Sequence, residues 1–142
     1  EEKVFLMKLI LFFIFFLLLS FKSYSHGTII ISDVEHNEGY IDVKIYTDKK
    51  SFLNEELAAE SIRKKATQGE TIIPLNILHE GTIAVVVYHD EDGDGKLKTG
   101  FFWRPKEGFA FSNNYMPKGP PSFKKASINL EHGVPVTINL NY

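Results

Sequence analysis

Alternation of apolar and polar side chains is the feature that most constrains the fold of this chain, because a period of two is the period of a β-strand. In residues 40–47, Ile41, Val43 and Ile45 occupy every second position, which predicts a strand with one buried face. About seven short strands of this kind, separated by close turns, predict an all-β, two-sheet sandwich. The predicted strands cover residues 28–34, 40–47, 62–67, 71–78, 82–88, 127–130 and 134–140, with a short helical turn at 54–59.

Turn residues between these runs predict which strands pair. Glu38-Gly39 predicts a hairpin between the first two strands, and residues 79–81 predict a second hairpin between the fourth and the fifth. Gly133 can adopt the positive φ of a third turn. Residues 83–88 are apolar on both faces, which predicts a central strand. Pro135 has no amide hydrogen and therefore places the last strand at a sheet edge.

The N-terminal segment has the layout of a secretory signal. Met7 and Lys8 precede an apolar run at residues 9–19, and small residues follow at Ser23 and Ser25. The run is shorter than the roughly 20 residues of a membrane-spanning helix, so we expect cleavage after Ser25. A retained membrane anchor is the alternative. With cleavage after Ser25, residues 1–25 are upstream residues plus the signal peptide, and residues 26–142 are a single domain. The expected location is secreted or periplasmic.

Composition excludes several classes of function. The 142 residues include no cysteine, which removes disulfides, thiol catalysis and thiolate metal sites. The formal net charge is −2, whereas a nucleic-acid-binding domain is normally strongly basic. We therefore expect no nucleic acid among the partners, and membrane contact only through the signal segment before its cleavage.

The most specific chemical motif is an acidic loop. Asp90, Asp92 and Asp94 recur at every second position, as in the first half of a calcium-binding loop, where the hard cation takes six to eight oxygens. Phe101 stands where that pattern has its bidentate glutamate, so another ligand must complete the site. A solvated, metal-free turn is the alternative. With calcium as the expected cofactor, the candidate metal-site residues are Asp90, Asp92, Asp94, Lys96 and Glu107.

Residues 90–121 form a long segment rich in aromatic side chains and without sustained periodicity. Loops of this length are uncommon unless they are functional or disordered. Trp103, Phe109 and Phe111 are the candidate ligand-binding residues, because clustered exposed aromatic rings mark binding surfaces. The alternative is that these rings fold back and cover the open end of the sandwich.

The residue pattern gives an enzyme less support. No two of the five histidines share a metal-binding spacing such as H-x-x-x-H, although a mature N-terminal His26 with a second histidine would resemble the copper site of histidine-brace oxygenases. Ser112 lies outside any G-x-S-x-G motif, and a glycosidase carboxylate pair that includes Glu107 has no further support. We therefore predict no catalytic residue.

Three motifs in order resemble a known bacterial family. They lie at residues 89–97, 105–114 and 119–123, and with them the chain resembles the domain of unknown function (DUF) family 2141. Lys98 stands where the family often has an acidic residue, and Ala110 replaces its usual glycine. The resemblance implies an exported β-sandwich, similar to transthyretin-like or carboxypeptidase-regulatory-like domains, and it brings no catalytic residues.

These features together predict an exported, non-catalytic binding or structural module that holds a calcium-type cation in its loop at residues 90–95. The expected partner is a protein or carbohydrate of the cell envelope or the extracellular space. The alternative is a secreted metal-dependent enzyme, a hydrolase or a copper oxygenase, with its site in residues 90–122. A third hypothesis is adhesion or assembly through the edge strand near Pro135.

Overall fold

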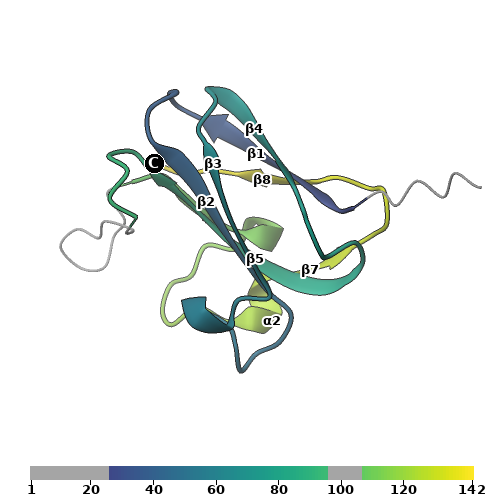
Figure 1. Cartoon of the computed structure of the whole chain (residues 1–142). Helices are drawn as coiled ribbons and strands as arrows, with labels where there is room; N and C mark the ends of the chain where they lie inside the picture. The colour runs from purple at the N-terminus through teal and green to yellow at the C-terminus, as the bar shows by residue number, and fades with distance from the viewer. Residues whose placement is uncertain (1–25, 96–106) are drawn as a thin grey trace, which may run out of the picture.

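The computed structural model describes residues 26–95 and 107–142, which form a two-layer β-sandwich (Figure 1). One sheet has three strands in the order β4-β1-β8, and the other has five, with β3, β2, β5 and β6 in order and β7 also paired to β5. The predicted fold class is therefore confirmed. The strands are β1 (Thr28–Val34), β2 (Tyr40–Tyr46), β3 (Glu60–Lys65), β4 (Gly69–Pro74), β5 (Gly81–Asp90), β6 (Phe109–Phe111), β7 (Ser127–Leu130) and β8 (Val136–Asn139).

Helical structure in the described residues is limited to short turns. η1 (Glu55–Leu57) is a 3-10 turn that begins where the Asn54 side chain accepts a hydrogen bond from the Glu56 amide, which confirms the predicted helical turn. η3 (Ser112–Asn114) and α2 (Phe123–Ala126) lie in the chain between β6 and β7. Among the residues described, no helix has the length and apolar character needed to cross a membrane.

The core lies between the two sheets. Ile41, Val43 and Ile45 of β2 have no exposed surface, as their alternation predicts. β5 contacts three strands, with β2 along one edge and β6 and β7 along the other, so the prediction of a central strand is also confirmed. The inward side chains of both sheets complete the core: Ile29, Ile31, Ile73, Ile83, Val85, Val87, Ala110, Leu130, Ile138 and Leu140.

The outward face of the five-stranded sheet is covered at one end, where η1 and α2 lie (Figure 1). Phe52 packs edge-on against Tyr46 at 5.5 Å and against Phe123 at 5.8 Å between ring centres. Phe111 and Ala126 are buried in this second apolar cluster. The outward face of β2, which the alternation leaves outside the predicted core, is only partly exposed, because aromatic side chains of later segments fold over it.

The predicted hairpins are wrong, because each short connection crosses from one sheet to the other. β1 pairs with β4 and β8, whereas β2 pairs with β3 and β5. Gly39 has a φ of 66°, and a Cβ at this position would lie 2.0 Å from the Asp90 carbonyl oxygen. The connection between β1 and β2 therefore folds tightly across the end of β5 instead of closing a hairpin.

The fourth and fifth strands also lie in different sheets, and β4 ends earlier than predicted. Pro74 cannot donate a ladder hydrogen bond. Beyond it, the buried carboxylate of Glu60 accepts hydrogen bonds from the amides of Asn76, Ile77 and Leu78, at 2.5, 3.3 and 3.3 Å. A side chain of β3 thus supplies the acceptors that a neighbouring strand would otherwise provide, and residues 75–78 turn away from the sheet.

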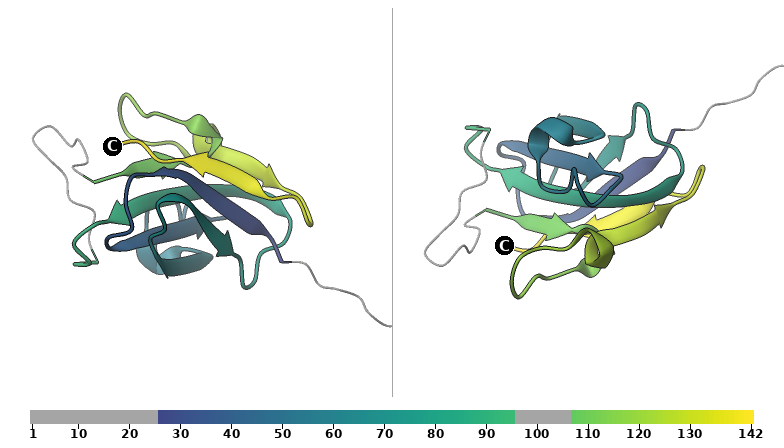
Figure 2. Two further views of the ribbon diagram at one scale, coloured as in Figure 1. Left: turned by 90° about the horizontal axis from the view of Figure 1, so that it is seen from above. Right: turned by 90° about the horizontal axis from the view of Figure 1, so that it is seen from below.

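The C-terminal strands are joined in the same manner. Gly133 has the expected positive φ of 73°, but β7 pairs with β5 and β8 pairs in parallel with β1. β8 lies at the edge of the three-stranded sheet, which confirms the prediction from Pro135. Both views in Figure 2 show the C-terminus at the end of the sandwich where β5 ends.

Candidate functional site

The last residues of β5 carry polar side chains to both faces of the five-stranded sheet. Pairing with β2 sets His89 opposite Ile41 and Asp90 opposite Tyr40. Because Ile41 belongs to the core and side chains alternate along a strand, His89 faces inward and Asp90 faces outward. Both residues are completely buried. Polar groups buried to this degree need specific partners.

On the outward face, the guanidinium of Arg63 joins two carboxylates. Its Nη1 donates to Asp42 Oδ2, and its Nη2 donates to Asp90 Oδ2 at 2.6 Å. The guanidinium carbon also lies 4.3 Å from the centre of the Tyr40 ring, within the range of a cation–π interaction. Burial raises the pKa of Asp42 although Arg63 opposes it, and the charge of Asp90 adds to the rise.

The carboxylate of Asp90 also organises the acidic loop. Its Oδ1 accepts from the Asp94 amide at 3.1 Å, and its Oδ2 accepts from the Gly95 amide at 2.8 Å. The Asp94 amide also reaches Asp92 Oδ1 at 3.3 Å. Burial alone would raise the pKa of Asp90, but the hydrogen bond from Arg63 and those from the two amides outweigh it and hold this pKa below its usual value. Asp90 is therefore a fixed anion.

Three of the predicted metal-site residues converge. Asp90, Asp92 and Glu107 each offer a carboxylate oxygen, and these oxygens lie within 4.8 Å of one another. Asp90 and Glu107 are buried, and Asp92 is exposed. Asp94 contributes its amide to the loop, and its carboxylate is not part of this group. Lys96 lies outside the described residues.

The predicted aromatic residues lie elsewhere. Phe111 is buried, with ring centres 6.2 Å from Phe52 and 5.7 Å from Tyr115, and Phe109 is half-buried at 6.2 Å from Phe111. These two rings belong to the apolar cluster on the outward face of the sheet. Trp103 lies outside the described residues.

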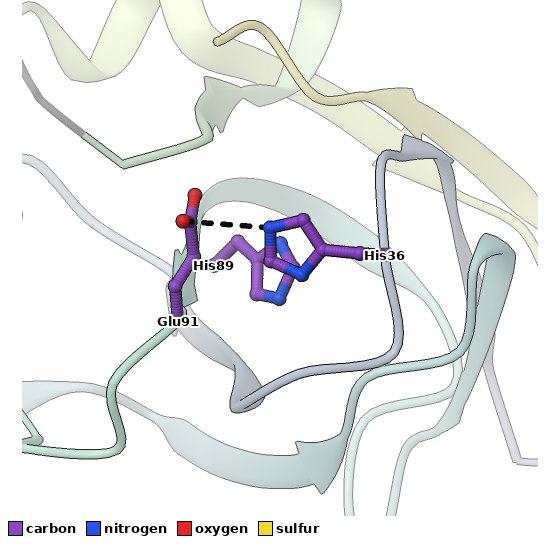
Figure 3. Close-up of side chains that lie close together, drawn as sticks. All are labelled: His36, His89 and Glu91. Carbon is purple, nitrogen blue, oxygen red and sulfur yellow. Dashed lines mark ion pairs between the residues drawn. The ribbon is translucent and has the colours of Figure 1, made fainter.

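On the inward side, the fold brings together His36, His89 and Glu91 (Figure 3). One ligand atom from each lies within 4.8 Å of the other two. His36 Nε2 is 3.4 Å from Glu91 Oε2, and the two imidazole ring centres are 4.7 Å apart. His36 comes from the connection between β1 and β2, and Glu91 follows β5 directly.

The hydrogen bonds of His89 define which of its ring nitrogens carries the hydrogen. Nε2 lies 2.7 Å from the carbonyl oxygen of Glu38, and because a carbonyl only accepts, Nε2 donates. Nδ1 then accepts from the Tyr142 hydroxyl at 2.6 Å, and that hydroxyl accepts from the Glu35 amide at 3.2 Å. The Tyr142 ring is packed against Gly108, where a Cβ would lie 2.5 Å from it.

Sequence reasoning missed Arg63, His36 and Tyr142. The signal for Arg63 is a basic residue on the same sheet face as Asp42, which becomes visible only with the register that pairs the two residues across β2 and β3. Tyr142 and His36 carry no comparable signal, because they are 106 positions apart in the chain and come near one another only through their separate contacts with His89.

Comparison with known proteins identifies the family. The model of an uncharacterised protein family conserved in bacteria, DUF2141, matches residues 29–138. The match covers most of the chain, and the chain therefore belongs to this family. Searches of curated proteins and of solved structures found no match.

Proposed function

We propose that this member of the DUF2141 family is an extracytoplasmic, non-catalytic module that binds a calcium-type cation at Asp90, Asp92 and Glu107. The observation that carries the proposal is the convergence of these three carboxylates, two of them buried, within 4.8 Å. Carboxylates this close repel one another, and a cation among them relieves the repulsion. The secretory layout of residues 7–25 supports the extracytoplasmic location.

The hydrogen bonds of Asp90 leave room for an ion. An ionised carboxylate has about four acceptor sites. Among residues 26–95 and 107–142, two donors, the Gly95 amide and Arg63, bond to Oδ2, and one donor, the Asp94 amide, bonds to Oδ1. We therefore assign Oδ1 as the oxygen of Asp90 that binds the cation. Arg63 and the amides keep the carboxylate ionised and in position, as a binding residue requires.

The site also has a structural consequence. Asp90 and Asp92 precede residues 96–106, and Glu107 follows them. A cation shared by these carboxylates joins the two ends of that segment, which contains Trp103. Binding would stabilise the folded protein by about 2.7 kcal/mol when the free calcium concentration is a hundred times Kd. We propose a protein or carbohydrate of the cell envelope or the extracellular space as the partner of this module.

Calorimetric titration of the purified protein with Ca²⁺, together with thermal melting in calcium and in chelator, tests the proposal. We expect calcium to raise Tm and chelator to reverse the rise. Glu107→Gln and Asp92→Asn should each weaken calcium binding by about tenfold or more. Asp94→Asn is the matched control, because it keeps the amide that bonds to Asp90, and it should change affinity by less than about threefold.

Two results would count against the site. If calcium produces neither binding heat nor a shift in Tm, the proposed cation site is wrong. If Glu107→Gln and Asp94→Asn lose calcium affinity equally, calcium binding depends on the overall charge of the loop rather than on these three carboxylates.

A further inference from the structure

We infer that His36, His89 and Glu91 form a second metal site, for a transition-metal ion of the zinc type. This inference is independent of the calcium proposal. The two sites use different faces of one short segment, because Glu91 lies between Asp90 and Asp92 in the chain. Calcium takes oxygen ligands, whereas two imidazoles with one carboxylate suit zinc, copper or nickel.

The distances are close to those that a tetrahedral ion needs. Zinc binds nitrogen and oxygen ligands at about 2.0 to 2.2 Å, so neighbouring ligand atoms of a tetrahedral site lie about 3.4 Å apart. His36 Nε2 and Glu91 Oε2 already have this separation, at 3.4 Å. The remaining pairs lie within 4.8 Å, and rotation of exposed side chains can shorten them. The side chains of His36 and Glu91 are each 33% exposed, so an ion can reach them from solvent.

His89 has the surroundings of a metal-binding histidine. A ligating imidazole almost always donates its other N–H to a carbonyl or a carboxylate, which fixes the ring. His89 Nε2 donates in this way to the Glu38 carbonyl at 2.7 Å, which leaves Nδ1 as the nitrogen with a lone pair. The Tyr142 hydroxyl occupies that lone pair in the structure, at 2.6 Å. Tyr142 is 48% exposed, so its side chain can move aside for an ion.

His36 provides a further reason for an ion at this place. Its Nδ1 is shielded from solvent and has no hydrogen-bond partner in the part of the chain that the structure describes. A buried nitrogen without a partner is unfavourable. His36 presents Nε2 towards Glu91 in the present orientation, and a change of its side-chain torsions can present Nδ1 instead, because a turn of the ring about the Cβ–Cγ bond moves Nδ1 to the position of Cδ2.

Zinc titration of the whole purified protein by calorimetry, in saturating calcium and at about pH 7.5, tests this assignment. We expect His36→Gln and Glu91→Gln to weaken zinc binding by more than about tenfold. Tyr142→Ala should tighten it about fivefold, because the competing hydrogen bond to Nδ1 is removed. His36 and Glu91 are partly exposed, so these variants are expected to fold, and thermal melting of each verifies it.

Two control variants keep the test specific. His79 and His132 form another histidine pair, with ring centres 6.0 Å apart, and His79→Gln should leave zinc affinity unchanged. Glu107→Gln should weaken calcium binding by about tenfold or more and leave zinc binding unchanged. The inference is overturned if the protein does not bind zinc, if His79→Gln rather than His36→Gln removes binding, or if Glu107→Gln weakens zinc as much as Glu91→Gln does.

Discussion

Replacement of Arg63 by methionine tests whether the outward-facing ion pairs stabilise the fold. The substitution leaves Asp42 and the fully buried Asp90 without the guanidinium that joins them. Removal of one partner from a buried pair costs about 3 to 5 kcal/mol. The Arg63 side chain is itself 34% exposed, and solvent screening reduces this figure. With the cation–π contact to Tyr40 included, we expect Arg63→Met to lower the free energy of unfolding by about 2 to 3 kcal/mol at neutral pH.

The pH dependence of this loss has a definite sign. The pKa of Asp90 in the folded protein is held below its usual value, so its charge stabilises the fold above the unfolded pKa of about 3.9. That contribution is lost as the pH falls through the folded pKa. In Arg63→Met, burial still raises the pKa of Asp90, but Arg63 no longer lowers it. The difference between wild type and variant should therefore be largest near neutral pH and shrink below about pH 4.

Urea denaturation in chelator, followed at several pH values, measures both effects. Lys65→Met is the matched control, because Lys65 is exposed on the same strand and its Nζ lies 5.3 Å from the centre of the same Tyr40 ring. It should change stability by less than about 0.5 kcal/mol. A loss in Arg63→Met that is equally small, or a large loss that does not vary with pH, would refute the electrostatic account.

Three other substitutions, together with Gly69→Ala as a control, test the connections between the strands. Gly39→Ala should cost more than about 3 kcal/mol in urea denaturation, because its Cβ would meet the Asp90 carbonyl, whereas Gly69→Ala, with a positive φ but open space, should cost only about 1 to 2. Glu60→Ala should cost about 3 kcal/mol, since three backbone amides lose their acceptor; a cost below about 1 would contradict this role. Asp48→Asn should lower Tm at neutral pH and have no effect well below pH 4, because the amides of residues 51 and 50 lower the pKa of Asp48; a Tm difference that persists in acid would exclude it.

The strands could be predicted because their signal is local, whereas their pairing could not. Alternation within residues 40–47 reports which side chains of β2 face the core. The partner of a strand depends on whether its connection turns back or crosses to the other sheet. Gly39 is compatible with both outcomes, and its close approach to the Asp90 carbonyl at the end of β5 becomes visible only in the folded chain. β6 was missed for a related reason, since its three residues are too few for a period to show.

In the candidate site, too, the parts with a local sequence signal could be predicted, and the contacts between distant strands could not. The acidic loop follows from a spacing that can be read directly, and Glu107 was selected as a ligand from across the intervening segment. The positive charge beside Asp90 is Arg63, and this contact requires the register of β2 against both β3 and β5. The histidine group requires more, since His36 reaches His89 only because the first connection crosses the end of the sandwich.

The burial of His89 and Asp90 side by side is hard to explain by folding alone. The rest of the buried surface of β5 is provided mainly by apolar residues, and replacing a buried ionic or polar group by a well-packed apolar one is often neutral or stabilising. Here both residues instead have fixed partners, Arg63 for Asp90 and the Glu38 carbonyl for His89. Such partners hold a side chain in one orientation, which ion binding requires and mere closure of the sandwich does not. We therefore infer that one polar dipeptide supplies a carboxylate ligand to one face of the sheet and an imidazole ligand to the other.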